Sequence, residues 1–336
     1  MAFSKNVSLK PYNTFGIDVK AKYFTFFSSE HELQQILQTL PAEENILILG
    51  GGSNILFTKD FDGVILLNAI KGIEIISEDK DCVYIRAGGG VNWHDFVMYC
   101  VEHNYGGVEN LSLIPGNVGA SPMQNIGAYG VEIKDVFDQL DAVCIATKEV
   151  KTFNKKDCRF GYRESVFKKE LKGKYIITSV TYRLTKNPVF NISYGALQAE
   201  LTKRNIHEIS LKKISDAVID IRRSKLPDPA VTGNAGSFFK NPVVDADVVN
   251  KLRHHYPGMP VFSADHNFKI PAAWLIEQCG WKGFRKGDAG CYDKQPLVLV
   301  NYGKASGSEL FELSGQIKQS VFKKFQVELE REVNII

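Results

Sequence analysis

The chain has 336 residues, which at roughly 150 residues per domain corresponds to about two domains. Hydrophobic residues make up 44% and charged residues 24%, so disordered, collagen-like and coiled-coil architectures are excluded. Lys and Arg number 41 against 38 Asp and Glu, and the basic doublets are scattered along the chain. This balance argues against a nucleic-acid partner but allows an anionic small molecule.

The lack of a recognisable targeting signal and the pattern of cysteines indicate a cytoplasmic protein. The first residues lack the apolar core of a secretory signal, and no run approaches the roughly 18 apolar residues of a membrane span. The six cysteines form no CxxC pair, which is typical of free thiols in a reducing compartment. His254, His255 and His266 lack the ligand spacing of a zinc site, so we expect no bound metal and no membrane partner.

Short β-branched or aromatic runs bounded by glycine fill the chain from about residue 19 to 186. Such runs predict a sheet-rich α+β domain. The predicted strands cover 46–49, 64–67, 73–76, 83–87 and 175–184. Among them, residues 91–103 carry apolar side chains at a roughly helical period, which predicts a helix packed on that sheet.

Longer helical patterns follow from about residue 195. Residues 211–223 predict an amphipathic helix, a second helix follows Asp245 to about residue 256, and a third covers 271–279 and stops at Gly280. Residues 297–300 predict a strand. We place the domain boundary near 190–210, with a first domain at 17–188 and a second at 205–336.

In the C-terminal part of the chain, the spacing of apolar residues changes from a helical to an alternating pattern. Residues 308–325 predict a helix that presents these residues toward a core: Phe311, Ser314 or Ile317, Val321 and Phe325. Beyond it, apolar residues alternate with Glu328, Glu330 and Glu332, which predicts a half-buried terminal strand. The alternation places the three glutamates on one face and does not distinguish between them.

Half of the glycines, 14 of 28, lie between residues 50 and 130. The sharpest group follows a predicted strand and consists of Gly50, Gly51 and Gly52, with Ser53 and Asn54 behind them. Glycines allow positive φ and close backbone approach, so consecutive N–H groups can converge on an anion such as a pyrophosphate. A glycine-rich turn without a ligand is the alternative, since the segment is neither a Walker loop nor a GxGxxG motif followed by a helix.

A second glycine-dense stretch, residues 113–130, is too long for a simple turn and too poor in charge for a solvated linker. Its small residues would let the backbone pack against a flat ring, and Gln124 and Asn125 offer orienting amides. A rigid Ω-loop without a ligand is the alternative. Two such loops in one sheet-rich domain favour a large nucleotide.

Two further segments carry polar residues in an aromatic setting. Residues 160–165 place Arg163 beside Phe160 and Tyr162, where a surface ion pair is the plain alternative. Residues 225–242 contain Ser237 next to Phe238, and a turn hydroxyl is the plain alternative there. No GxSxG elbow surrounds Ser237, so the sequence does not indicate a serine hydrolase.

In this order, the segments resemble the UDP-N-acetylenolpyruvoylglucosamine reductase family. The resemblance spans nearly the whole chain and is carried by NTFGI at 13–17, ILGGGSNILF at 48–57, IPGNVGASPMQNIGAYG at 114–130, FGYRES at 160–165, KLPDP and GNAGSFFKNP within 225–242, and LEREV at 329–333. It implies a flavoenzyme that completes UDP-N-acetylmuramate in peptidoglycan synthesis. The implied fold is α+β, with an FAD-binding domain of the vanillyl-alcohol oxidase type followed by a smaller α+β substrate-binding domain.

The resemblance also implies roles for single residues. The implied FAD contacts are Gly50, Gly51, Gly52, Ser53, Asn54, Ile114, Pro115, Gly119, Ser121 and Gly127. Arg163, Ser237 and Glu332 match the family's catalytic residues. Tyr194 matches the tyrosine of the long-loop subtype that closes over substrate, while the residues that match those holding the nucleotide sugar are Lys225, Asn241 and Gln295. No histidine lies between residues 32 and 93, which favours FAD that is not covalently bound.

The family's reaction requires these residue types. NADPH reduces the flavin, which then delivers hydride to the enolpyruvyl double bond and builds negative charge next to the substrate carboxylate. Arg163 suits that charge, a hydroxyl such as Ser237 can supply a proton, and an adjacent acid can orient or share one. The resemblance further implies a cytoplasmic monomer that serves cell wall biogenesis, cell shape and cell division.

One departure from the family pattern is Arg331, which stands where the terminal motif usually has proline. We expect activity to be retained, because this change removes no proton-transfer group, and we leave the pairing of the terminal strand open. Two other functions are kept as alternatives. One is a flavin-dependent sugar or alcohol oxidase, and the other is a nucleotide-sugar binding protein without turnover.

Overall fold

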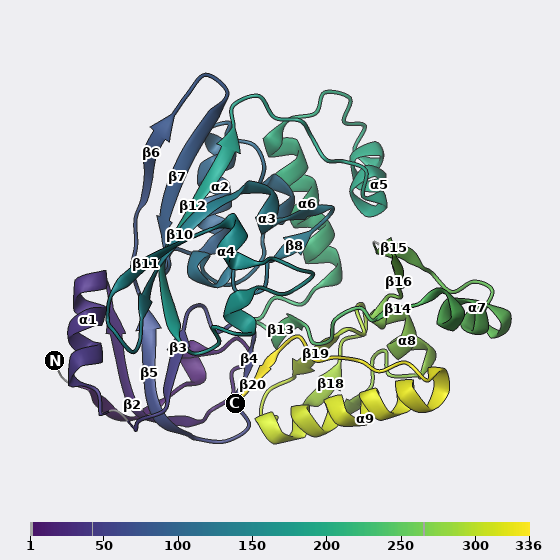
Figure 1. Ribbon diagram of the computed structural model, residues 1–336. Helices are drawn as coiled ribbons and strands as arrows, with labels where there is room; N and C mark the ends of the chain where they lie inside the picture. Colours follow the sequence, from purple (N-terminus) through teal and green to yellow (C-terminus); the bar gives the residue numbers. More distant parts are fainter. Residues whose placement is uncertain (1–2, 42, 265) are drawn as a thin grey trace. The chain divides into compact units, whose positions relative to one another are not determined.

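The computed structural model describes residues 3–41, 43–264 and 266–336 (Figure 1). The chain divides into two compact units. Unit 1 comprises Met1–Val7, Ala21–Gly51 and Asp62–Ser224, and unit 2 comprises Ser8–Lys20, Gly52–Phe61 and Lys225–Ile336. The main division therefore falls at Ser224, beyond the region of 190–210 that the change of sequence pattern indicates.

Unit 1 is built on two sheets. One has the strand order β1-β2-β5-β3 and the other, fully antiparallel, has the order β11-β10-β12-β7-β6. All five strands predicted from short apolar runs are present. The strands are β1 (Ser4–Ser8), β2 (Lys20–Phe27), β3 (Ile46–Leu49), β5 (Phe61–Asn68), β6 (Ile73–Glu78), β7 (Cys82–Gly88), β10 (Phe137–Cys144), β11 (Val150–Asn154) and β12 (Tyr175–Thr185).

The predicted helix at 91–103 is α2 (Trp93–Glu102), and it packs on the five-stranded sheet. Asn92 caps its first turn by accepting from the N–H groups of His94 and Asp95. The ring of Phe96 lies 4.7 Å from that of Tyr182 on β12. The other α-helices before residue 190 are α1 (Glu30–Thr39), α3 (Ile133–Val136) and α4 (Lys155–Cys158).

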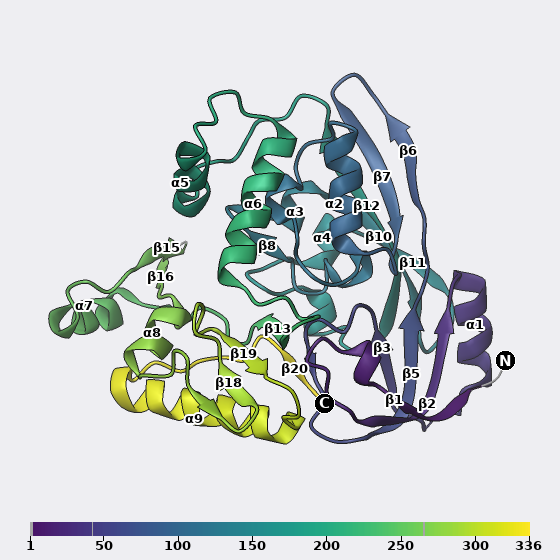
Figure 2. The same cartoon turned by 180° about the vertical axis from the view of Figure 1, so that it is seen from behind.

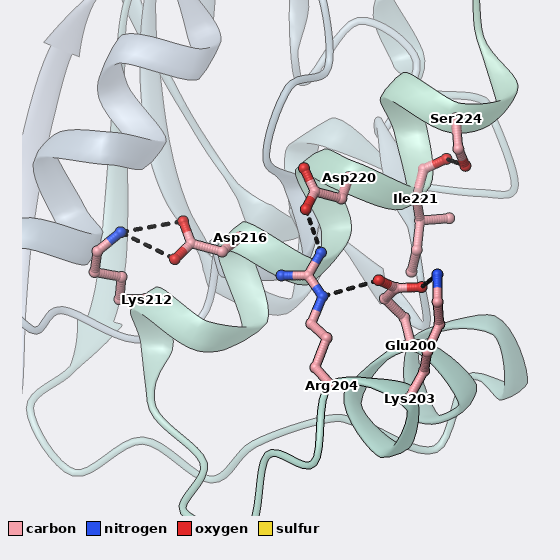
Figure 3. Close-up of polar contacts among 8 residues, drawn as sticks. All are labelled: Glu200, Lys203, Arg204, Lys212, Asp216, Asp220, Ile221 and Ser224. Atoms are coloured by element: carbon pink, nitrogen blue, oxygen red, sulfur yellow. Dashed lines mark hydrogen bonds and ion pairs between the residues drawn. The ribbon is translucent and has the colours of Figure 1, made fainter.

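Two further helices, α5 (Gly195–Lys203) and α6 (Leu211–Lys225), pack on each other through their own apolar cluster. Leu197 and Leu201 of α5 meet the predicted apolar face of α6, so α5 needs α6 as its partner. Arg204 adds a polar link, since it pairs with Glu200 at the end of α5 and with Asp220 on α6 (Figure 3). Seen from behind, α6 lies beside α2 (Figure 2), and the hydroxyl of Ser215 on α6 contacts Sδ of Met98 on α2 at 3.8 Å.

Unit 2 combines small sheets with three helices around one core. The predicted helices and the predicted strand at 297–300 are all present. The elements are β4 (Ile55–Leu56), β13 (Gly233–Ser237), β14 (Val243–Val244), α7 (Ala246–His255), β15 (Phe262–Ala264), β16 (Asn267–Lys269), α8 (Ala272–Gln278), β17 (Arg285–Lys286), β18 (Ala289–Cys291), β19 (Val298–Asn301), α9 (Gly307–Phe325) and β20 (Asn334–Ile335).

The core face of α9 differs from the predicted one at Phe311. Leu310, Leu313 and Ile317 are buried, whereas Phe311 is 38% exposed. The guanidinium carbon of Arg331 lies 4.4 Å from the centre of the Phe311 ring, so a cation rather than the core covers this side chain. The prediction that Phe311 faces the core was wrong.

The terminal segment alternates in burial as predicted but forms only a short strand. Val327, Leu329 and Val333 are buried, and β20 pairs in parallel with β4. Between them, Arg331 forms an antiparallel bridge with Phe239. The terminal segment therefore does pair through the region of Arg331.

Candidate functional site

The glycine loop after β3 excludes side chains and offers hydrogen-bond donors. A Cβ on Gly51 would lie 2.9 Å from the Cα of Gly116, and one on Gly52, with φ +61°, would lie 2.0 Å from the carbonyl oxygen of Tyr12. The N–H groups of Gly51, Gly52 and Ser53 donate to no described residue. Three consecutive backbone donors are thus available to an anion such as a pyrophosphate.

The second glycine-dense loop, residues 113–130, is braced from within unit 1. Gly119 donates its N–H to the carbonyl of Gly89 at 2.9 Å, and a Cβ on Gly119 would lie 3.0 Å from that oxygen. The hydroxyl of Ser121 is buried and bonds to that of Tyr182 at 2.7 Å. The hydroxyl of Ser121, a predicted cofactor contact, thus supports the loop from within the core.

Arg163 adopts an unusual backbone conformation that its neighbours impose. Its φ is +55°, a left-handed conformation that costs an ordinary residue roughly 1 kcal/mol or more. Its Nη2 donates to the carbonyl of Gly127 at 2.5 Å, and its guanidinium carbon lies 5.4 Å from the ring centre of Tyr162. The Nδ2 of the buried Asn125 donates to the carbonyl of Gly161 at 3.0 Å, which fixes the start of the same turn. Asn125 therefore holds the turn of Arg163 and does not serve as an orienting amide for a ligand.

The carbonyl that Arg163 contacts belongs to a tight hairpin formed by β8 (Gly127–Ala128) and β9 (Val131–Glu132). Its two turn residues, Tyr129 and Gly130, have φ of +50° and +85°, the combination of a type I′ turn. The ring of Tyr129 meets the ring of Tyr194 edge-on, with centroids 5.4 Å apart. Tyr194 itself is 49% exposed and directly precedes α5.

Leu113, at the start of the second loop, is held by two side chains that sequence reasoning did not single out. Its φ is +59°, its N–H donates to Nδ1 of His94 at 3.0 Å, and its carbonyl accepts from Nε of Arg222 at 3.2 Å. Burial lowers the pKa of His94, and the neutral ring is the form that can accept. Burial also lowers the pKa of Arg222, and the nearby hydroxyl of Tyr129 opposes this shift. The one signal for Arg222 is its place four residues after Val218, on the edge of the apolar stripe of α6.

In unit 2, Ser237 and Glu332 are brought together by backbone hydrogen bonds. Ser237 is exposed at the end of β13, opposite Val298 of β19. The next carbonyl, that of Phe238, accepts from the N–H of Glu332 at 2.9 Å. Glu332 is only partly exposed. The hydroxyl and the acid thus belong to adjacent backbone segments.

Asn54 joins the same cluster within unit 2. Its Nδ2 donates to the carbonyl of Glu332 at 3.4 Å, and its own carbonyl accepts from the N–H of Asn334 at 3.1 Å. The end of the glycine loop is therefore anchored to the segment that carries Glu332. This links a predicted cofactor contact to two predicted catalytic residues.

The predicted substrate-binding residues are spread over both units. Lys225 is exposed at the end of α6 and is the first residue of the third segment of unit 2. Asn241 accepts from the N–H of Ala272 at 2.9 Å through its Oδ1 and so holds the start of α8. Gln295 lies in the turn before β19, where its carbonyl accepts from Val298 at 3.0 Å. Tyr194, by contrast, belongs to unit 1.

Within the described part of the chain, no three His, Cys, Asp or Glu side chains are grouped as a metal would require. None of the helices formed by residues 3–41, 43–264 and 266–336 is long and apolar enough to cross a bilayer.

Known proteins match the chain over its whole length. A reductase from Amoebophilus asiaticus, named UDP-N-acetylenolpyruvoylglucosamine reductase, is 51% identical over 100% of both chains, and one of the same name from Flavobacterium johnsoniae is 52% identical over 100% of both. The chain belongs to the UDP-N-acetylenolpyruvoylglucosamine reductase family. The model of this family's C-terminal domain matches residues 228–336, and that of an FAD binding domain matches residues 21–154.

The fold agrees with this membership. The crystal structure of the UDP-N-acetylenolpyruvylglucosamine reductase from Thermus caldophilus aligns over 100% of this chain and 99% of its own, with a TM-score of 0.70 at 22% identity. The predicted fold class, an FAD-binding α+β domain followed by a smaller substrate-binding domain of this reductase family, is confirmed.

Proposed function

We propose that the protein reduces UDP-N-acetylenolpyruvoylglucosamine to UDP-N-acetylmuramate, with FAD as its cofactor and NADPH as the electron donor. The observation that carries this proposal is that relatives with the name of this reductase match the entire chain at about half identity. The reaction would serve peptidoglycan synthesis and, through it, cell wall biogenesis, cell shape and cell division. We further infer that the protein acts in the cytoplasm as a monomer.

The residues of the glycine loop fit a dinucleotide cofactor. Gly51 and Gly52 leave no room for a side chain, and their N–H groups, with that of Ser53, have no protein acceptor among the described residues. They would hold the pyrophosphate of FAD, with the loop at residues 114–130 against the rest of the cofactor. When bound, FAD supplies the hydride relay between NADPH and the enolpyruvyl double bond.

Arg163 would bind the substrate carboxylate and the negative charge that develops next to it. Its bond to the carbonyl of Gly127 and its left-handed backbone fix the guanidinium before substrate arrives. A guanidinium held in this way need not reorganise when the charge develops, which is the condition for strong electrostatic stabilisation. Arginine also matches a carboxylate with two parallel donors.

Ser237 and Glu332 would handle the proton. The hydroxyl of Ser237 is exposed at a strand end and can donate a proton to the carbon next to the one that receives hydride. Glu332 can orient or share a proton with the neighbouring groups, and its backbone bond to Phe238 keeps it beside Ser237. The nearby Glu330 pairs its carboxylate with Lys240 at 2.6 Å.

Four residues would hold the nucleotide sugar. Lys225 offers an exposed ammonium for a phosphate, and Asn241, with Oδ1 engaged at α8, would present its amide nitrogen. Gln295 would add a second amide. Tyr194, exposed at the start of α5, would cover the substrate with its ring.

The visible spectrum of the purified protein tests this function. We expect the bands of oxidised flavin, which bleach with NADPH and recover when the enolpyruvyl nucleotide is added without oxygen. Reoxidation by oxygen alone, with no response to the nucleotide, would identify an oxidase instead. A colourless protein that takes up no FAD yet binds the nucleotide would favour the binding protein without turnover.

A further inference from the structure

Asn110 lies fully buried in the turn Glu109–Leu111 of unit 1, away from any role assigned above. Its Nδ2 donates at 2.8 Å to the carbonyl of Tyr129 and at 2.8 Å to the carbonyl of Asn191. One amide nitrogen therefore joins the turn of the β8–β9 hairpin to the segment that leads to Tyr194. The two acceptors are 62 residues apart in the sequence.

The side-chain oxygen of Asn110 indicates why this position holds an asparagine. Oδ1 of Asn110 is buried and has no hydrogen-bond partner among the described residues. A buried acceptor without a partner destabilises the fold, and an apolar side chain of similar size would avoid that cost. The two N–H donors are thus the feature that distinguishes this side chain from leucine at the same place.

A second link runs in parallel to the first. Nδ2 of Asn191 donates to the carbonyl of Gly130 at 2.9 Å, and Oδ1 of Asn191 accepts from the hydroxyl of Ser193 at 3.0 Å. The hairpin is thereby bonded directly to Asn191 at the carbonyl of Gly130, and through Asn110 at the carbonyl of Tyr129. Its first strand is bonded to Arg163 through the carbonyl of Gly127.

We propose that Asn110 is a positioning residue that couples the Tyr194 segment to Arg163 through the β8–β9 hairpin. The proposal rests on the proposed function, which makes Tyr194 and Arg163 substrate contacts. A displacement of residues 191–194 moves the carbonyls of the turn, and the two-residue turn transmits it to Gly127 and the guanidinium. Closure of Tyr194 over the substrate and binding of the substrate carboxylate by Arg163 then occur together.

The test compares Asn110→Leu with a matched control, Asn68→Leu. Asn68 is also buried in unit 1 and donates to a backbone carbonyl, that of Ile177, at 2.9 Å, but it makes no contact with the hairpin. Amide hydrogen exchange is measured over residues 190–205 and over the rest of unit 1. If Asn110→Leu does not fold, Asn191→Ala replaces it, because Asn191 is partly exposed and its change removes only the parallel link.

We expect exchange over residues 190–205 to rise about tenfold more in Asn110→Leu than in Asn68→Leu, which is the effect of roughly one net hydrogen bond lost locally. Equal rises in both variants would overturn the proposal, because they would show general destabilisation only. This readout needs no turnover, so it remains decisive if the wild-type protein fails to reduce the nucleotide and the proposed function falls.

Steady-state kinetics distinguish two roles of Asn110: holding the Tyr194 segment over the substrate, or also positioning Arg163. We expect Asn110→Leu to raise KM for the enolpyruvyl nucleotide and also to lower kcat, each by about tenfold, while NADPH reduces the bound flavin at the normal rate. A higher KM with unchanged kcat would show that Asn110 holds the Tyr194 segment without acting on Arg163, which would contradict the coupling.

Discussion

The backbone N–H of Glu332 donates to the carbonyl of Phe238 at 2.9 Å, one residue beyond Ser237. A main-chain bond therefore places the acid next to the hydroxyl that we propose to handle the proton. Changes to either side chain should leave this arrangement intact. Chemistry and stability can then be tested separately in this part of the molecule.

Glu330 and Glu332 form a matched pair for such a test. Glu330 pairs with Lys240, whose side chain is only 9% exposed, so we expect Glu330→Gln to lower the free energy of unfolding by about 1 kcal/mol and to leave substrate reduction nearly unchanged. Glu332→Gln should instead lower the rate of flavin reoxidation by the substrate roughly 10²- to 10⁴-fold. Denaturant unfolding and stopped-flow reoxidation measure the two effects. Similar behaviour of the two variants in both assays would count against the assignment.

Arg331→Pro should be tolerated. The bridge around Arg331 uses the carbonyl of Glu330 and the N–H of Glu332, so a proline at 331 removes no bond of this ladder. The proline removes the contact with Phe311 and the bond from Nε of Arg331 to the hydroxyl of Ser314 at 2.8 Å, together worth about 1–2 kcal/mol. Stiffening of the unfolded chain offsets about 0.5–1 kcal/mol of this loss. We expect a Tm within a few degrees of the wild type. Glu332→Pro is the control and should unfold at a clearly lower temperature, because it removes the donor to Phe238.

The regular elements were predictable because each has a local pattern. The runs of β-branched residues form the expected strands β3, β5, β6, β7 and β12. The apolar stripe of α6 is buried as expected and consists of Ile214, Ala217, Val218 and Ile221. The prediction for Phe311 failed because two apolar stripes can be drawn along α9 that both contain Ile317, Val321 and Phe325. One stripe begins at Leu310 and the other at Phe311, and only tertiary packing decides which of these two residues is buried. The boundary at Ser224 was equally hidden, since it depends on α5 packing against α6.

The candidate site was less predictable from local patterns. The resemblance selected Arg163, but its left-handed backbone and its bond to Gly127 depend on a hairpin more than thirty residues earlier in the chain. Asn110 carried no signal, because a single asparagine in a loop is usual in any sequence. Glu332 could not be separated from Glu330 by alternation, because both glutamates fall on the same face of the predicted strand.

Stability should fall in mild acid because of His94. The neutral Nδ1 of His94 accepts a hydrogen bond from the N–H of Leu113. Burial lowers the pKa of His94 below 6.5; the charge of Asp95 opposes this shift, and the charges of Arg223 and Arg222 add to it. The unfolded chain therefore takes up the proton first, so the contribution is complete above pH 6.5 and is lost as the pH falls toward the folded pKa. His94→Asn offers an acceptor that does not titrate. Unfolding free energies from pH 8 to 5 should diverge below pH 6.5, with the wild type losing more, and parallel curves would contradict the role of His94.

Arg204 should couple α5 to α6. It pairs with Asp220 across the two helices and with Glu200 at 2.8 Å within α5 (Figure 3). A double-mutant cycle of Arg204→Gln and Asp220→Asn should give a coupling energy of about 0.5–1 kcal/mol that decreases with salt. Lys212 and Asp216, paired within α6 at 3.0 Å, form the control cycle. Hydrogen exchange in α5 should respond to the first cycle and not to the second, and a response to both would refute the link.

The most direct test of the proposed reaction is single-turnover kinetics of Ser237→Ala. Ser237 is exposed at the end of β13, so its loss should not disturb the fold. The account predicts that NADPH reduces the flavin of this variant at the wild-type rate, while reoxidation by the enolpyruvyl nucleotide slows by roughly 10²-fold or more. Reoxidation at the wild-type rate would contradict the role of Ser237 as proton donor and, with it, the proposed chemistry of this site.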